Sequence, residues 1–71
     1  MATIFDIITE AIREQIRNGR TQQDIAQELG ITQSMVSGIL RGTRGVGRRT
    51  AEAVLKANPL WLQEFLWRRS R

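Results

Sequence analysis

The 71-residue sequence contains no cysteine, no histidine and no tyrosine. Without cysteine there is no disulfide, and without cysteine or histidine a zinc site of the usual kind is not expected. The chain also lacks the imidazole, thiol and phenol groups that most often act in catalysis, and its carboxylates are scattered over predicted helix surfaces. The sequence therefore predicts a protein that is not an enzyme and that binds no metal or cofactor.

Long apolar runs are also missing, since none approaches the ~18 residues that a membrane span requires. Met1 and Ala2 lead straight into Thr-Ile-Phe-Asp, which does not resemble a secretory signal. We therefore expect a soluble cytoplasmic protein with no membrane contact and no small-molecule ligand.

The chain is too short to bury a large core by itself. A domain of this size buries only roughly 60% of the surface that its unfolded form exposes. Small domains gain the missing stability from disulfides, from a metal or from a partner subunit. Because the first two are not expected here, the sequence favours a partner subunit.

Charge is distributed unevenly along the chain, which carries eleven basic and seven acidic residues. Residues 1–35 have a net charge of −2 and residues 36–71 a net charge of +6. All but one of the basic residues are arginines, whose planar guanidinium pairs well with phosphate. The second half of the chain is therefore suited to a polyanion.

Apolar residues recur at helical intervals, and capping and stop residues separate them into short helices. Thr3 with Asp6, and Thr21 with Asp24, have capping-box spacing. Asn58 followed by Pro59 is typical of an N-cap and a first helical residue. We predict one all-α domain spanning residues 1–71, with five short helices at residues 4–17, 22–29, 32–41, 48–57 and 59–69.

The third predicted helix has one apolar and one polar side. Its buried stripe is expected to hold Val36, Ile39 and Leu40, with Met35 at the edge of the core. At 100° per residue, the opposite side forms a continuous polar face of Gln33, Ser34, Ser37, Gly38 and Arg41. In the fourth helix Val54 and Leu55 are expected to point inward.

The spacing of Ala26, Gly30, Val36 and Leu40 resembles the helix-turn-helix of the phage repressor and Cro class, which has the λ-repressor-like fold. The stretch "RGTRGVGRRTAEAVLKA" is similar to the headpiece of the Lac repressor family, and the two resemblances together cover residues 21–57. Two features depart from that headpiece, which usually has serine at the position of Gly47 and acidic residues in place of Arg48 and Arg49. We expect no sensor domain, so the effector binding of that family is not carried over to this chain.

The resemblance implies that residues 32–41 enter the major groove of DNA, where base edges show distinct patterns of donors and acceptors. By analogy with phage repressors, Gln33 and Ser34 are the first candidates for base reading and Ser37 is the third. Phosphates are contacted by cations and helix N-termini. The candidates for that role are Gln22, Gln23, Thr32, Arg41, Arg44, Arg48 and Arg49.

The last predicted helix is apolar on two sides. One side is a stripe wide enough to close the core, formed by Trp61, Leu62, Phe65 and Leu66, and Trp67 lies back near Leu60 on the other. Phage repressors of this class often pair through their final helix. We expect a homodimer whose interface holds Leu60, Trp61, Phe65 and Trp67, although both tryptophans could instead lie within one chain. The predicted function is a sequence-specific regulator of transcription, a small repressor or Cro-like protein of phage or bacteria, bound to an inverted repeat in the nucleoid. The alternative is a protein-interaction module or antitoxin-type adaptor that binds a partner through the last helix.

Overall fold

The computed structural model describes residues 3–43 and 45–69. Within these residues the chain forms five α-helices and no strand, which confirms the predicted all-α class. The helices are α1 (Ile4–Arg17), α2 (Gln22–Leu29), α3 (Gln33–Arg41), α4 (Arg48–Ala57) and α5 (Leu60–Arg69). The third and fifth helices begin one residue later than predicted, and the other bounds agree.

Reciprocal side-chain hydrogen bonds fix the starts of α1 and α2. The Asp6 backbone N–H donates to Thr3 Oγ1 at 3.3 Å, and the Thr3 N–H donates to Asp6 Oδ2 at 3.1 Å. Thr21 and Asp24 form the same capping box at α2. The boxes satisfy backbone N–H groups that have no acceptor inside the helix, so both starts are specified locally.

The connection between α4 and α5 differs from the prediction. Asn58 ends α4 in the left-handed region, with φ 48° and ψ 54°, and its N–H donates to Val54 O at 3.0 Å. The Pro59 carbonyl accepts the first backbone bonds of α5, including one from Gln63 N at 3.2 Å. Asn58 is therefore the C-cap of α4 and not the N-cap of α5, because asparagine tolerates positive φ better than most residues.

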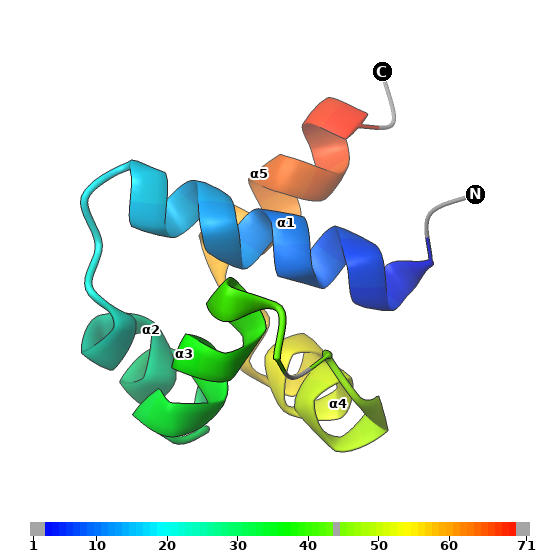
Figure 1. The fold of residues 1–71 in the computed structure, drawn as a ribbon. Helices are drawn as coiled ribbons and strands as arrows, with labels where there is room; N and C mark the ends of the chain where they lie inside the picture. Colours follow the sequence, from blue (N-terminus) through cyan, green and yellow to red (C-terminus); the bar gives the residue numbers. More distant parts are fainter. Residues whose placement is uncertain (1–2, 44, 70–71) are drawn as a thin grey trace.

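The helices surround one core, and α1 lies between α5 on one side and α2, α3 and α4 on the other (Figure 1). All five helices and the loop before α4 contribute buried side chains to this core. Its residues are Ile8, Ala11, Ile12, Ile25, Ala26, Leu29, Val36, Ile39, Val46, Ala51, Val54, Trp61 and Leu62.

Two leucines expected in the core are less buried than predicted. Leu40 is only partly buried against the core, and Leu55 is 49% exposed. Val54 is fully buried and takes the core-facing position of α4. Leu55 points about 100° away from it around the helix axis, which places it outside the core.

Candidate nucleic-acid interface

α2 and α3 pack against each other as a helix-turn-helix beneath α1 (Figure 1). Ala26 of α2 and Val36 of α3 are both buried in the core that the two helices share, and a residue as small as alanine suits a close approach of two helices. Gly30 ends α2 with φ 70°, a conformation that glycine adopts without steric cost, and the Ile31 N–H donates to Ala26 O at 3.0 Å. The turn therefore has the geometry that the sequence predicted.

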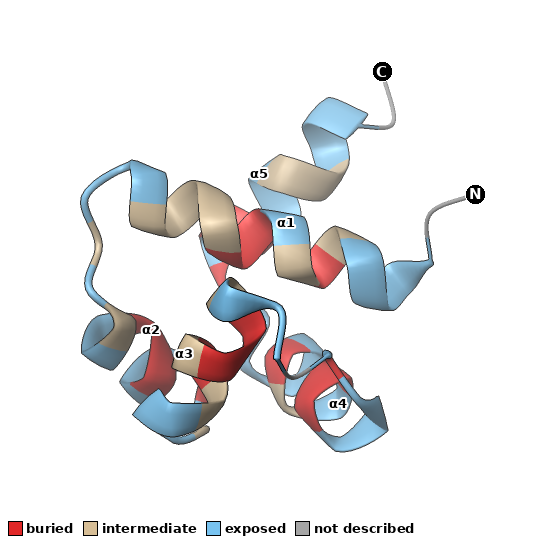
Figure 2. Cartoon of the chain, viewed as in Figure 1, coloured by how far each residue is buried: buried red, intermediate tan, exposed pale blue. Residues whose placement is uncertain are grey.

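The first turn of α3 is exposed and uncharged. Gln33 and Ser34 lie on the surface, and Ser37 one turn later is half-buried, whereas Val36 is fully buried (Figure 2). Thr32 Oγ1 accepts the Met35 N–H at 3.1 Å and thereby fixes the start of this turn. The three candidate base-reading residues therefore share one accessible side of α3.

Gly38 does not belong to that accessible face, contrary to the prediction. It is buried, and its carbonyl accepts both the N–H of Thr43 at 3.1 Å and the Oγ1 hydroxyl of Thr43 at 3.3 Å. Helical angles alone placed Gly38 among polar neighbours, but in the folded chain it is buried, and its carbonyl takes part in the C-terminal cap of α3. Gly38 therefore anchors the following loop and offers no close approach to DNA.

Arginines lie in the last turn of α3 and at the start of α4. Arg41, Arg48 and Arg49 are all exposed. The Arg48 Nε lies 3.6 Å from Glu52 Oε1, with the arginine side chain 90% exposed, so this ion pair holds it weakly. Within residues 3–43 and 45–69, Arg41 and Arg49 form no ion pair. The candidate Arg44 lies outside the described residues.

Two helix N-termini accompany these cations. Gln22 is half-buried and Gln23 exposed at the start of α2. At α4 the N-cap is Gly47, which supplies no side-chain hydrogen bond, and the first turn contains no acidic residue. The N-terminus of α4 therefore keeps backbone donors that no capping side chain satisfies.

The residues expected at a dimer interface divide into two groups. Trp61 lies in the core of the protomer with 9% of its surface exposed, and Phe65 is half-buried with the Arg68 and Arg69 Cζ atoms 5.9 and 5.8 Å from its ring centroid. Leu60 and Trp67 are 67% and 68% exposed. Trp61 therefore belongs to the side of α5 that closes the core, and its predicted place at a dimer interface is wrong, because its indole packs inward. Its indole N–H finds a polar partner at the edge of the core.

That partner is Glu28 on α2, which the sequence reasoning missed together with Arg20. Both Trp61 Nε1 and Arg20 Nη1 donate to Glu28 Oε1, at 2.6 and 2.8 Å. Val46 was missed as well, and it is 92% buried. The burial of Val46 could have been inferred from its place as the one aliphatic residue among glycines and arginines in this loop. No local sequence pattern, by contrast, indicates that Glu28 pairs with Trp61.

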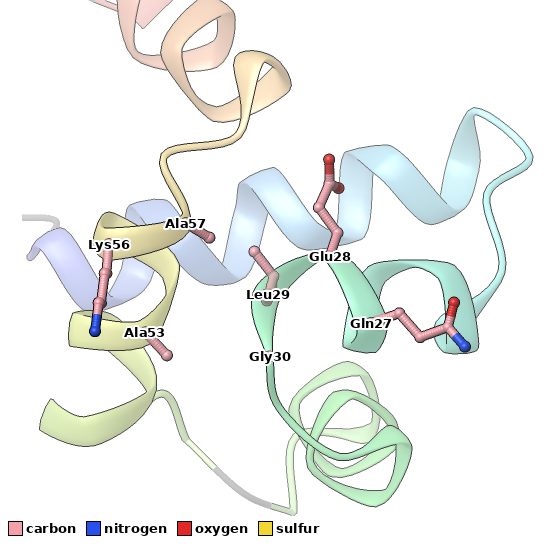
Figure 3. A pocket seen from close by; sticks show the side chains of 7 residues that line it. All are labelled: Gln27, Glu28, Leu29, Gly30, Ala53, Lys56 and Ala57. Atoms are coloured by element: carbon pink, nitrogen blue, oxygen red, sulfur yellow. The ribbon is translucent and has the colours of Figure 1, made fainter.

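A shallow groove of about 360 Å³ lies beside the helix-turn-helix, between the end of α2 and α4 (Figure 3). Small and apolar side chains form much of its wall, and Glu28 and Lys56 are its charged members. The lining residues are Gln27, Glu28, Leu29, Gly30, Ala53, Lys56 and Ala57.

No three acidic side chains in the described ranges gather closely enough to hold a metal ion. None of the helices described is both long and apolar enough to cross a membrane.

The comparison with family models gives one match, described as helix-turn-helix, over residues 10–60. The matched segment includes all of α2, α3 and α4. No curated protein and no solved structure matches the chain. The matched family comprises DNA-binding regulators of transcription. With most of its length matched and its α2–α3 turn built as described, the chain belongs to the Cro/C1-type helix-turn-helix family.

Proposed function

We propose that the protein is a sequence-specific regulator of transcription that places α3 in the major groove of double-stranded DNA. The observation that carries this proposal is the exposed, uncharged first turn of α3, packed on α2 and followed by exposed arginines. Neutral polar side chains suit base edges, and cations suit phosphates. Base contacts would thus be made by the first turn of α3, and phosphate contacts by the arginines that come later in the chain.

Base reading falls to Gln33, Ser34 and Ser37. The Gln33 amide can donate to adenine N7 and accept from adenine N6, and a serine hydroxyl can donate or accept. Ser37 is less accessible than Gln33 and Ser34, so its hydroxyl can contact a base only where the base edge lies close to α3.

Phosphate contacts fall to the helix N-termini and to the cations. Arg48 and Arg49 lie in the first turn of α4, where a positive charge opposes the helix dipole at a cost of about 0.3–1 kcal/mol each. A phosphate at this point would offset this unfavourable charge–dipole interaction. It would also accept hydrogen bonds from the backbone N–H groups at the start of α4. The full proposed set is Gln22, Gln23, Thr32, Arg41, Arg44, Arg48 and Arg49.

A second copy of the chain is the proposed partner of α5. Leu60 and Trp67 are seven residues apart, which places them within about 20° of each other around the helix axis. Both side chains are strongly exposed, and pairing across a two-fold axis would bury both copies of this apolar pair. The dimer would set two recognition helices about 34 Å apart, matching an inverted repeat with half-sites roughly 10 to 10.5 base pairs apart. We place this regulator in the cytoplasm, on the nucleoid, as a small repressor or Cro-like protein.

Selection of bound duplexes from a random pool tests the proposal. We expect an enriched inverted repeat, and we expect Gln33→Ala to relax the preference at one position in each half-site. A motif without two-fold symmetry would overturn the dimer, and enrichment of no motif would overturn sequence-specific binding.

The exposed Leu60 and Trp67 also support a second candidate, a protein-interaction module or antitoxin-type adaptor. A purified protein without salt-dependent DNA affinity, whose binding to a protein partner is abolished by Leu60→Ala, would favour that function.

A further inference from the structure

Side chains from the α1–α2 turn and from α5 meet at Glu28 of α2, and a side chain of α1 joins them through Arg20. Its Oε1 atom accepts hydrogen bonds from Trp61 Nε1 at 2.6 Å and from Arg20 Nη1 at 2.8 Å. Arg20 Nη1 also lies 3.5 Å from Gln15 Oε1 on α1. Glu28 and Trp61 are 33 positions apart in the chain, so this contact joins distant segments.

The carboxylate of Glu28 is held in its charged form at this junction. Burial alone would raise the pKa of the Glu28 carboxyl, but the hydrogen bonds from Trp61 and Arg20, with the positive charge of Arg20, more than offset this effect. The pKa therefore lies below its ordinary value. At neutral pH the ionised oxygen is a strong acceptor for the indole N–H of the largely buried Trp61.

The contact matters because α5 is otherwise supported mainly by α1. α5 packs chiefly against α1, and Arg68 Nη2 ties its far end to Glu14 Oε1 of the same helix at 2.6 Å. α1 separates α5 from most of the helix-turn-helix (Figure 1). The Glu28 side chain points toward the α5 side of α2, away from the neighbouring Gln27 (Figure 3). Its bond to Trp61 therefore links α5 directly to the helix-turn-helix.

We infer that Glu28 is a positioning residue that fixes the rotation and tilt of α5 relative to α3. A rotation of α5 would move Leu60 and Trp67, which are the proposed dimer contacts. The orientation of α5 therefore sets the distance between the two copies of α3 in the dimer. Glu28 thereby determines which half-site spacing the protein prefers, although it touches no DNA. This inference rests on the proposed homodimer on an inverted repeat.

Binding to duplexes that differ only in half-site spacing tests the inference. The probes are the selected inverted repeat, the same repeat with one base pair inserted or removed at its centre, and a single half-site. We expect the wild-type chain to bind its preferred spacing at least about tenfold more tightly than the shifted duplexes. Glu28→Ala should reduce that ratio to about two- or threefold and leave single half-site affinity unchanged, because α3 itself is unaltered.

Two conservative variants separate positioning from general stability. Glu28→Gln keeps an acceptor oxygen for Trp61 and should restore the wild-type ratio. Trp61→Phe fills the core but removes the indole donor, so it should lose the spacing preference even if Glu28→Ala does not fold. Glu10→Ala removes an exposed carboxylate of α1, 3.7 Å from Arg13, and should leave the ratio unchanged.

Trp61 fluorescence supplies a second readout, recorded in a Trp67→Phe background so that Trp61 is the remaining tryptophan. Glu28→Ala should shift its emission maximum, and Glu28→Gln should shift it less. The inference is overturned if Glu28→Ala or Trp61→Phe keeps the wild-type spacing ratio, or if Glu28→Gln loses it as fully as Glu28→Ala. A wild-type chain without any spacing preference would instead overturn the proposed dimer, which distinguishes the two failures.

Discussion

Replacing Gly47 with aspartate should make the fold more stable and its binding to DNA weaker. Gly47 is the N-cap of α4, with φ −87° and ψ −180°, so its backbone already has the extended conformation that any residue adopts there. A Cβ at this position would meet no other atom within 4 Å. An aspartate at position 47 can therefore be accommodated without strain, and its carboxylate can accept hydrogen bonds from the backbone N–H groups of the first turn of α4.

The expected gain in stability follows from two contributions. A side-chain cap is worth a few tenths of a kcal/mol relative to glycine, and an anion near a helix N-terminus adds about 0.3–1 kcal/mol. Together they give about 0.5–1.3 kcal/mol, which for a domain of this size raises Tm by about 2–10 °C. Gly47→Ser is the matched control, since it adds the cap without the charge and should raise Tm by only about 1–3 °C.

DNA binding should respond in the opposite direction. If the N-terminus of α4 meets a phosphate, the carboxylate of Gly47→Asp repels that phosphate and weakens binding to every sequence alike, while Gly47→Ser retains the wild-type affinity. Thermal unfolding by circular dichroism and titration of a labelled duplex provide the two measurements. Equal DNA affinity for the aspartate and serine variants would refute the placement of α4 on the backbone, and a lower Tm for aspartate would refute the capping argument.

Four further outcomes are expected. Gln33→Ala should cost about 1–3 kcal/mol of binding at one base position, measured with a set of single-base operator variants. Arg49→Ala should weaken all sequences alike and flatten the slope of log K against log salt by about one unit, measured by titration at several salt concentrations. Ile12→Ala, at a fully buried site, should destabilise the fold by about 2–5 kcal/mol in urea unfolding. Because the pKa of Glu28 is lowered in the folded chain, its contribution is complete above the ordinary carboxyl pKa and is lost as the pH falls through the lowered value. Glu28→Gln should therefore make the loss of stability below about pH 5 less steep, as urea unfolding across acid pH would record.

Most helix starts and stops were predictable because they depend on residues close together in the chain, the exception being Asn58, which was expected to begin the last helix and instead ends α4. Thr3 and Thr21 cap helices through carboxylates three positions later, and Gly30 ends α2 with its own backbone conformation. The exposure of Gln33 and Ser34 also followed from helical angles, because both lie on the outer side of the first turn of α3.

The remaining features depend on contacts between distant segments, which angles and spacings do not encode. Gly38 is buried although its position on the helix put it among polar residues, and Leu55 is left outside because Val54 fills the core. Trp61 was predicted at a dimer interface, and its hydrogen bond could not be foreseen because the acceptor, Glu28, lies on α2, 33 positions earlier in the chain. Such pairings become visible only when the helices are placed in space.

The local definition of the helices has a consequence for how fast the chain reaches its native state. When capping boxes and glycine stops determine the boundaries, each segment can form before long stretches of chain have to be closed into loops. Helical domains dominated by near-neighbour contacts fold in roughly microseconds to milliseconds. If the chain acts as the proposed dimer, the delay between synthesis and operator occupancy would then be governed by the encounter of two folded protomers, which depends on their concentration, and not by folding.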